Sequence, residues 1–338
     1  MKRATIYDVA DRAKVSIATV SRVLNGRAKV TEETRARVME AVATLAYRPS
    51  PVARGLAMGA TSVLAVFYES FQSVFFSTLL AGAESEAAAN GYALMAYQIQ
   101  GREWEDLIRM PGRADGVIVS SSPNNEAFLQ SLAQSATPTV VLGHARADLK
   151  MDGVVPDSIM GVNAVIEHLM GHVRKRIAHI AGPASSRQSA ERRQAYIDAL
   201  ARHGLTCPEE CLVQGDFSFV GGAQAMARLL ALPEPPDAVF AANDVMAMGA
   251  MQSIEQHGLK VGVDIAVVGF DGLEAGEYMT PPLTTVFQPI EDLGRVAVRL
   301  LLERIEHPEA PVQEEVLPTA LIVRGSCGDT DAHEWMDE

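Results

Sequence analysis

Residues 15–25 read VSIATVSRVLN, and this short stretch decides how the N-terminal part of the chain folds. Its apolar residues Val20, Val23 and Leu24 recur at the spacing of one helix face, which predicts a helix over residues 17–25. Ser16 stands just before that helix, where a hydroxyl can accept a hydrogen bond from a free amide of the first turn. The opposite face carries short side chains and one basic side chain: Ile17, Ala18, Ser21 and Arg22.

Two further helices are predicted beside this one. Residues 6–13 gather their apolar side chains, Ile6, Val9, Ala10 and Ala13, on one face. Thr31 is placed to cap a third helix, with Glu32 and Glu33 at its positive end and an apolar stripe of Val38, Val42 and Leu45. Three short helices with a tight turn between the first two predict a helix-turn-helix unit, whose second helix can enter a DNA major groove.

The distribution of charge supports that reading. Residues 1–60 contain 11 Lys/Arg and 5 Asp/Glu, whereas the remaining residues contain 18 Lys/Arg and 37 Asp/Glu. A basic head on an acidic body favours binding to a polyanion while the body repels non-specific contact with nucleic acid. A small helical bundle with a merely basic surface is the alternative. The short residues on the outward face of residues 17–25 count against it, because they permit close approach to base edges.

The segments TIYDVADRAKVSIATVSRVLNG and VTEETRARVMEAVATLAYRPSPVARGLA resemble the DNA-binding headpiece of the lactose/galactose repressor (LacI/GalR) family. The resemblance implies that Ile17, Ala18 and Arg22 read bases. It also implies a set of residues that contact the DNA backbone: Thr5, Ser16, Thr19, Ser21 and Asn25. Lys14 departs from the family pattern, which often has Gly or Asn in the turn, where a left-handed backbone is easier.

Residues 49–61 are predicted to form a linker, because Pro49, Pro51, Gly55 and Gly59 interrupt any long helix. Within it, PVARGLA resembles the family's hinge helix, which orders on operator DNA. Leu56 matches the leucine that the family inserts into the minor groove at the dimer axis, where unstacking bends the duplex. The alternative is a passive tether.

From Ser62 onward, short apolar runs alternate with amphipathic stretches, as in SVLAVFY, GVIVSS, RIAHIAG and IAVVGFD. This succession predicts buried parallel strands and an α/β fold with two doubly wound lobes. The segments VPDSIMGVNAVIEHLMGHVRKRIAHIAGP and VVGFDGLEAGEYMTPPLTTV resemble the family's effector-binding core. That core has the architecture of periplasmic sugar receptors, and its chain crosses between lobes three times. The expected domains are a headpiece (1–48), a hinge (49–61), a core (62–328) and an acidic tail (329–338). Within the core, the expected lobes are about 62–158 with 290–318, and about 159–289 with 319–328.

Candidate effector-binding residues follow from matching motifs of the family. Arg192 can clamp hydroxyls or a carboxylate with two donors, and Asp271, at the end of IAVVGFD, can accept from paired sugar hydroxyls. Asn243 opens NDVMA, after another predicted strand. The remaining matches supply aromatic walls, a polar position and the lobe-crossing strand: Phe76, Phe217, Ser121 and Gln288. Near Phe76 the chain lacks the Asn-Pro that the family commonly carries.

Other site types are not expected. His168 and His172 have a zinc-compatible spacing, but Gly171 should end that helix. His203, Cys207 and Cys211 are also four apart, but Gly204 and Pro208 break any shared helical face and no fourth ligand is evident. The chain has no G-x-S-x-G and no P-loop, so neither a metal, a cofactor nor an enzyme activity is expected. It also has no membrane-spanning apolar run and a polar N-terminus, which favour a cytoplasmic protein.

These features together predict a sequence-specific DNA-binding regulator, and most simply a repressor of carbohydrate-utilisation genes controlled by a sugar-like effector. A homodimer on a pseudo-palindromic operator is expected, because one headpiece contacts few bases. The tail has no leucine heptads with which to build a tetramer. Two alternatives stay open: a regulator with a purine or another metabolite as corepressor, and a sugar-binding transport receptor, which would need a signal peptide and no basic head.

Overall fold

The computed structural model describes residues 4–24, 30–47, 61–68, 74–99, 114–120, 126–172 and 174–328 of the 338-residue chain. The chain divides into two compact units, residues 1–62 and residues 63–338. Four of the residues and segments singled out above lie outside the described residues: Asn25, Leu56 with most of the linker, Ser121 and the tail.

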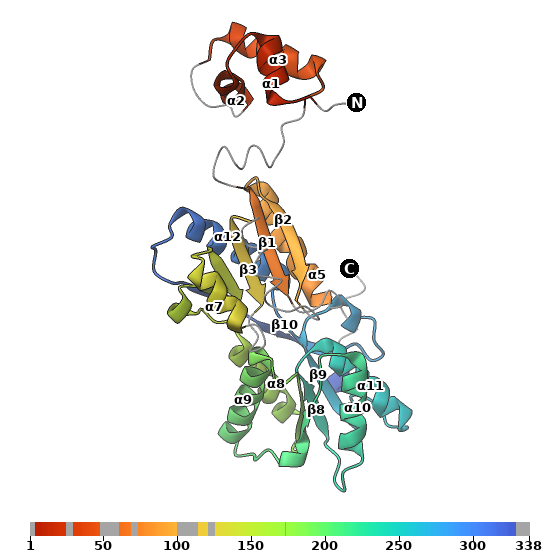
Figure 1. Cartoon of the computed structure of the whole chain (residues 1–338). Coiled ribbons are helices and arrows are strands. Elements are labelled where there is room, and N and C mark those ends of the chain that lie inside the picture. Colours follow the sequence, from red (N-terminus) through yellow and green to blue (C-terminus); the bar gives the residue numbers. More distant parts are fainter. Residues whose placement is uncertain are drawn as a thin grey trace. The chain divides into compact units, whose positions relative to one another are not determined.

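The first unit contains the three predicted helices, α1 (Ile6–Ala13), α2 (Ile17–Leu24) and α3 (Glu32–Thr44), seen in Figure 1. Their inward residues form one small apolar core, which includes Val9, Ala13, Val20, Val23 and Val38. The predicted helix-turn-helix arrangement is therefore confirmed, and its inward faces are those given by the helical spacing of the apolar residues.

Short polar side chains fix where these helices begin. The Thr5 hydroxyl accepts from the Asp8 amide, and the Asp8 carboxylate accepts from the Thr5 amide at 2.8 Å, which together form a capping box. The Ser16 hydroxyl accepts from the Thr19 amide at 3.1 Å at the start of α2, and Thr31 caps α3. These caps are local in sequence, so the chain itself determines the helix starts.

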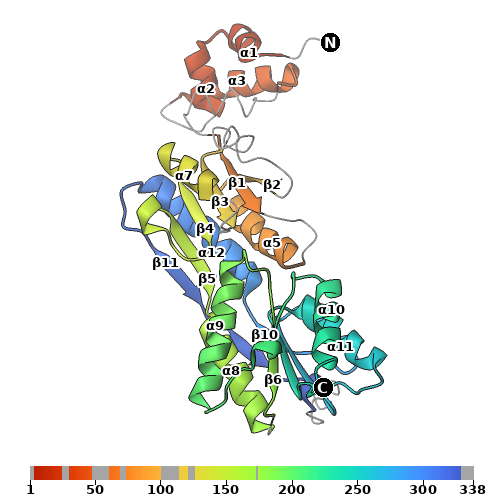
Figure 2. The ribbon, with the colours of Figure 1, turned by 60° about the horizontal axis from the view of Figure 1, so that its bottom comes forward.

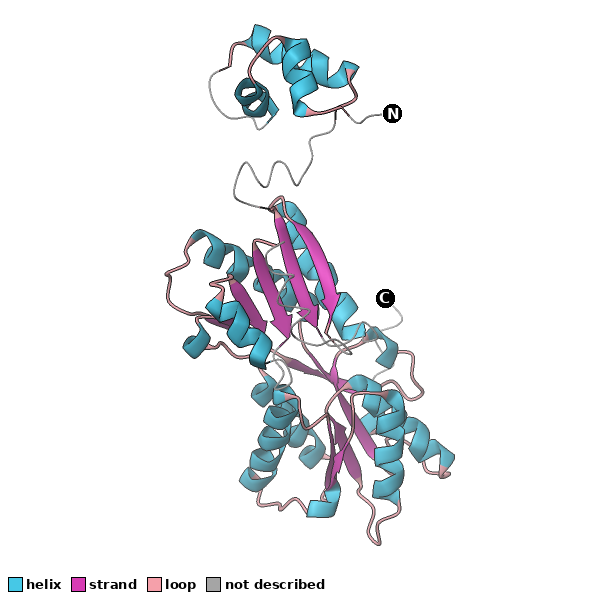
Figure 3. Cartoon of the chain, viewed as in Figure 1, coloured by secondary structure: helices cyan, strands magenta, loops and turns pink. Residues whose placement is uncertain are grey.

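In the part of the second unit that the structure describes, there are two six-stranded sheets, coloured magenta in Figure 3. In the first lobe every strand pair is parallel, in the order β11-β5-β4-β3-β1-β2. Its strands are β1 (Val63–Tyr68), β2 (Ala93–Gln98), β3 (Gly116–Ser120), β4 (Thr139–Leu142), β5 (Asp152–Pro156) and β11 (Glu314–Leu317).

The second lobe repeats this winding with the order β12-β10-β9-β8-β6-β7, but here the edge strand β12 is antiparallel to β10. Its strands are β6 (Ile177–Ala181), β7 (Leu212–Gln214), β8 (Ala238–Ala241), β9 (Ala266–Asp271), β10 (Thr284–Phe287) and β12 (Ala320–Ile322). The predicted two-lobed, doubly wound α/β core is thus confirmed. In such sheets ligands bind beyond the carboxyl ends of the strands.

Helices cover both faces of each sheet (Figures 1 and 2). In the first lobe, α5 (Val74–Ala89) and α12 (Ile290–Glu306) pack on one face and α7 (Glu126–Gln134) on the other. In the second lobe, α8 (Ser158–Gly171) and α9 (Arg187–Arg202) cover one face, and α10 (Phe219–Leu230) and α11 (Asp244–Gln256) cover the opposite face. Among the described residues, the short 3-10 helices are η3 (Ala147–Leu149), η4 (Glu209–Cys211), η5 (Glu274–Gly276) and η6 (Gly325–Cys327).

This double covering explains why central strands such as β1 are apolar throughout instead of alternating. Along β1, Leu64 and Val66 enter the core beneath α5 and α12, whereas Ala65 and Phe67 enter the core beneath α7. Successive side chains of a strand point to opposite faces, and both faces are buried here.

The chain passes between the two sheets three times, from β5 to α8, from β10 to α12 and from β11 to β12. The lobes also contact one another directly, because Leu273 and Val245 of the second lobe pack into the apolar core of the first. The register of β9 and β10 places Phe287 beside Asp271. As a result, Gln288 follows at the same edge of the second sheet.

Candidate DNA-reading surface and effector site

The outward face of α2 carries the side chains predicted to read bases. Ile17 is 40% exposed, and Ala18 and Arg22 are also exposed, whereas Val20 and Val23 on the same helix are buried. Ser21, predicted to face outward, is half-buried. Short side chains followed by one long basic side chain leave the helix able to approach a groove closely while a guanidinium reaches guanine or phosphate.

Lys14 ends α1 in the left-handed conformation, with φ 55° and ψ 46°. The turn between α1 and α2 therefore has the geometry for which Gly or Asn is easier, although the residue is a lysine. Its ammonium lies 3.2 Å from the Asp11 carboxylate, but both groups are largely exposed, so this ion pair contributes little.

Three of the residues predicted to contact the DNA backbone, Thr5, Ser16 and Thr19, have hydroxyls already engaged within the headpiece. The Thr5 hydroxyl donates to Asp8 at 2.7 Å, and the Ser16 and Thr19 hydroxyls lie 2.9 Å apart. Ser16 and Thr5 are exposed while Thr19 is half-buried. These hydroxyls fix the helix starts, so any contact with phosphate would be made from a rigid frame.

In the second lobe, Arg192 lies on α9 and is 4% exposed. Its Nη1 donates to the carbonyl of Ala242 at 2.6 Å, and its guanidinium carbon lies 3.6 Å from the centroid of the Phe270 ring. Burial lowers the pKa of Arg192, yet a guanidinium starts so high that it stays charged. The side chain is therefore a fixed cation held by a carbonyl on one side and an aromatic face on the other.

Asp271 ends β9 and is 5% exposed. The amide of Gln288, itself 1% exposed, donates from Nε2 to Asp271 Oδ1 at 2.6 Å. Burial, and next the negative charge of Asp244, raise the pKa of Asp271 to about 8, while Arg192 acts in the opposite direction. The structure thus brings together three predicted effector residues, Arg192, Asp271 and Gln288.

Asn243 and Phe217 form a second pair of predicted residues. The side-chain oxygen of Asn243, Oδ1, caps α11 by accepting from the Met246 amide at 2.9 Å, and its Nδ2 donates to the Phe217 carbonyl at 3.3 Å. Phe217 has a left-handed backbone with φ 65°, and its ring lies where a Cβ on Gly182 would be, 2.2 Å from the nearest ring carbon. The amide of Asn243 therefore holds the loop that positions the Phe217 ring.

In the first lobe, Phe76 is half-buried and stacks on Tyr68 with ring centroids 4.4 Å apart. Phe75 meets Phe76 edge to face at 5.5 Å. These rings stand beside the carboxyl end of β1, the edge at which ligands bind in doubly wound sheets.

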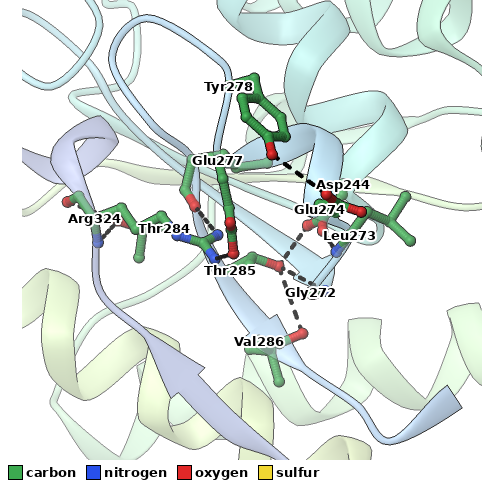
Figure 4. Close-up of polar contacts among 11 residues, drawn as sticks. Asp244, Gly272, Leu273, Glu274, Glu277, Tyr278, Thr284, Thr285, Val286 and Arg324 are labelled. Carbon is green, nitrogen blue, oxygen red and sulfur yellow. Dashed lines mark hydrogen bonds and ion pairs between the residues drawn. The ribbon is translucent and has the colours of Figure 1, made fainter. Parts of the chain in front are cut away.

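Three residues of this region did not emerge from the sequence. Phe270 supplies the ring beneath Arg192, and Asp244 and Thr285 form a buried hydrogen bond of 2.5 Å between α11 and β10 (Figure 4). Phe270 immediately precedes Asp271, and Asp244 immediately follows Asn243, so the neighbours of predicted residues were the available signal. Thr285 had none, because its partner lies 41 positions away.

A cavity of about 350 Å³ lies beside two of the crossings between the lobes. None of the predicted effector residues lines this cavity. Its lining consists of Phe287, Pro289, Asp292, Leu317, Pro318, Thr319 and Ala320. Among the described residues, no cluster of three or more His, Cys, Asp or Glu side chains is arranged to hold a metal ion. No described helix combines the length and apolarity needed to cross a membrane.

Comparison with known proteins agrees with this architecture in both units. Residues 5–50 match the model of bacterial regulatory proteins of the lacI family, and residues 166–327 match that of periplasmic binding protein-like domains. The ribose operon repressor of Escherichia coli strain K12 is 36% identical over 330 residues, which cover 96% of this chain and 99% of that protein.

Solved structures extend the likeness to three dimensions. A crystal structure of the lac repressor dimer bound to operator and the anti-inducer ONPF has a TM-score of 0.87 at 30% identity, over 96% of this chain and 99% of that chain. A LacI family regulator from Enterococcus faecium with bound ribose has a TM-score of 0.70 at 28% identity, over 78% of this chain and 98% of that chain. The chain therefore belongs to the lacI family of bacterial regulatory proteins, which regulate transcription by binding DNA.

Proposed function

We propose that this regulator is a repressor whose affinity for operator DNA is switched by a small sugar bound at Arg192, Asp271 and Gln288. One observation carries the effector half. In the described part of the chain, Arg192 Nε and Gln288 Oε1 are buried and have no hydrogen-bond partner. Leaving such an atom unpaired costs about 1–3 kcal/mol, which a ligand that bonds to both would recover.

The chemistry of these groups suits a sugar. A guanidinium donor, a carboxyl group and an amide oxygen at one strand edge match neighbouring hydroxyls, each of which can both donate and accept. The ribose operon repressor and the ribose-bound regulator among its relatives support a pentose as the first choice. A nucleobase corepressor is the second candidate, because Phe217 and Phe76 are half-buried aromatic side chains on which a flat ring could stack.

The DNA-binding half of the proposal rests on α2. We assign base reading to Ile17, Ala18 and Arg22, whose side chains are exposed on one face. The backbone contacts fall to Thr5, Ser16, Thr19, Ser21 and Asn25. A homodimer on a pseudo-palindromic operator follows from the small reach of one headpiece and is supported by the lac repressor dimer on its operator.

The proposed division of the chain is a headpiece (1–48), a hinge (49–61), a two-lobed core (62–328) and a short acidic tail. In the hinge, Leu56 would enter the minor groove at the dimer axis and bend the duplex. The protein would act in the cytoplasm, where the chromosome lies, and would regulate without catalysing a reaction.

Thermal unfolding of the full-length protein tests the effector. We expect D-ribose, from a set of pentoses, hexoses, disaccharides, nucleosides and nucleobases, to stabilise the protein by about 2.7 kcal/mol at a concentration one hundred times its Kd. Stabilisation by nucleobases alone would favour the second candidate. Silence of the whole set would contradict the proposed site.

The Leu56→Ala variant tests the hinge. It should bind operator more weakly, bend DNA less and respond less to effector, while the base preference set by α2 is retained. A passive tether predicts an unchanged bend angle and an unchanged effector response. Gel-shift bending assays with and without effector distinguish the two.

Analytical ultracentrifugation tests the proposed homodimer, and at micromolar protein concentration it should show the dimer.

A further inference from the structure

Asp244 is a fully buried carboxylate with both oxygens engaged by other elements. Its Oδ2 accepts from the backbone amide of Leu273 at 2.7 Å, and its Oδ1 accepts from the Thr285 hydroxyl at 2.5 Å. Figure 4 shows these contacts meeting at one point, where the start of α11, the turn after β9 and β10 come together. The carboxylate thus ties two other segments to the N-terminus of α11, where a negative charge is favoured.

The turn that Asp244 holds contains Asp271, the proposed effector acceptor. Asp271 has φ 139° and Gly272 has φ 76°, so two successive residues occupy backbone regions that favour glycine. An aspartate in such a conformation is strained and persists only where its surroundings hold it. Two hydrogen bonds hold the backbone just after Asp271. The Gly272 amide donates to the Thr285 hydroxyl at 3.3 Å, and the Leu273 amide donates to the Asp244 carboxylate.

Close packing against β9 leaves no room for Asp244 to move away. A Cβ on Gly269 would lie 2.1 Å from Asp244 Oδ1, so the carboxylate occupies the space that a side chain on β9 would fill. The position of the carboxylate is therefore fixed from three sides: by Gly269, by Leu273 and by Thr285.

Asp244 and Asp271 also interact electrostatically. Burial raises the pKa of Asp244 to about 6, and Thr285, Leu273 and Arg324 act against that rise. The pKa of Asp271 is raised by burial and by the charge of Asp244, and lowered by Arg192. Asp244 thus acts on Asp271 both through the backbone turn and through its charge.

We propose that Asp244 is a positioning residue for effector binding: with Thr285 it holds the Asp271–Gly272–Leu273 turn, so that the Asp271 carboxyl stays bonded to Gln288 and close to Arg192. Asp244 itself does not touch the effector. The inference rests on the proposed function, because it takes Asp271 as an effector acceptor.

Two neighbouring threonines of β10 provide a matched pair for the test. Thr285→Val removes the hydroxyl that bonds to Asp244 and Gly272, whereas Thr284→Val removes one that donates to the Arg324 carbonyl at 3.0 Å and accepts from its amide at 2.9 Å. Both threonines are fully buried, so both variants lose buried hydrogen bonds. In Figure 4 their partners lie on different segments.

The first measurement needs no ligand. Crystal structures of the full-length variants should show that the Asp271–Gln288 hydrogen bond or the positive φ of Asp271 is lost in Thr285→Val and in Asp244→Asn, and that both are kept in Thr284→Val. An unchanged turn in Thr285→Val and Asp244→Asn would overturn the proposal. If Asp244→Asn fails to fold, Thr285→Val decides the matter alone.

The second measurement is calorimetric titration with D-ribose over a range of pH. We expect about a tenfold loss of affinity in Thr285→Val and Asp244→Asn and less than about a twofold change in Thr284→Val. In Asp244→Asn the pH midpoint of the affinity should also move down, because a negative charge that raises the pKa of Asp271 is gone. Equal losses in both threonine variants, with no movement of the midpoint, would overturn the positioning role.

The two measurements separate the two proposals. If the wild-type protein does not bind D-ribose, the proposed sugar is wrong, and the crystal structures still decide whether Asp244 holds the turn. If D-ribose binds and the turn is unchanged in the variants, the proposed sugar is supported and the positioning role of Asp244 is wrong.

Discussion

The two units of this protein present their candidate functional side chains in opposite ways. On α2 the candidate reading residues Ile17 and Arg22 are exposed above a small apolar core. In the second lobe, Arg192, Asp271 and Gln288 are almost fully buried. A headpiece side chain keeps its water until it binds, whereas the core has already removed water from its polar groups during folding.

The difference reflects the two kinds of partner. DNA is a large polyanion that must be met by a protruding surface with hydrated charges, and much of its affinity comes from released counterions. A small effector such as the proposed sugar makes few contacts, so each contact has to come from a buried, fixed group that is costly to leave unpaired. A single substitution should therefore change DNA binding moderately when it lies in the headpiece, whereas a substitution of one buried group in the core should remove most of the affinity for effector.

The largest effect is expected from Arg192→Ala and Asp271→Ala. Each removes one of the buried groups that a sugar hydroxyl would meet, and each leaves the remaining groups unpaired. We expect at least about a hundredfold loss of effector affinity, measured by calorimetry. Operator binding by the effector-free protein should change by less than about twofold; wild-type effector affinity in both variants would mean that the site lies elsewhere.

Substitution on α2 should have an intermediate effect and should change selectivity more than affinity. Replacing Ile17 or Ala18 alters contacts with single bases, and a mismatched base pair at one position of a site costs about 1–3 kcal/mol. Selection from random duplexes should therefore return a changed operator preference. Arg3 is the control, because this basic residue precedes the reading helix in sequence and is expected to contact phosphate; its structure lies outside the described residues. Arg3→Gln should weaken binding to all sequences alike and lower the salt slope by about 0.9.

The contrast between exposed and buried groups can also be sharpened by pH. Asp271 has an ordinary pKa of 3.8 when unfolded and a pKa raised to about 8 in the folded protein. Between these values the folded state holds a proton that the unfolded state has lost. The free energy of unfolding should therefore fall as the pH rises from about 4 to about 8, by at most about 1.4 kcal/mol per pH unit for this one group.

Denaturant unfolding of wild type and Asp271→Asn over this range measures the contribution. The asparagine variant cannot ionise at this position, so its unfolding free energy should fall less steeply. Parallel pH profiles would show that Asp271 is ionised throughout and that its burial is less complete than the structure indicates.

The smallest effect is expected at the turn of the headpiece. Lys14 is left-handed, and Lys14→Gly should stabilise the headpiece by about 0.5–1 kcal/mol because glycine adopts this conformation without strain. Lys14→Ala, which keeps the strain and loses the exposed pair with Asp11, should be close to wild type. Scanning calorimetry of the first unfolding transition checks both; a destabilised glycine variant would mean that the lysine contributes through contacts instead.

Most of the headpiece could be predicted from the sequence. Its helices begin at caps formed three residues apart, as in Thr5 with Asp8 and Ser16 with Thr19, and its core follows the helical spacing of Val20 and Val23. Such information is local, so a single chain displays it directly. Central strands such as β1 were predictable for a similar reason, since their apolar runs are continuous in sequence, whereas short edge strands such as β7 and β11 have no such run and were not predicted.

The proposed effector site was only partly predictable. Matching motifs indicated Arg192, Asp271 and Gln288, but the sequence did not indicate that Gln288 donates to Asp271 or that Phe270 lies beneath Arg192. It gave no signal for Thr285. These contacts join residues 17 to 78 positions apart, and their geometry depends on the register of β9 with β10 and on where α9 and α11 pack.

The sequence by itself determined the order of elements, the caps that begin the three headpiece helices, the outward face of α2 and the alternation of strand and helix in the core. All of these depend on residues within a few positions of one another. Only the tertiary structure decided which polar groups are buried together and which of their atoms stay unpaired. Burial and hydrogen bonding of Arg192, Asp244 and Asp271 arise where distant strands and helices meet, and the cost of an unpaired charge exists only once water has been excluded there.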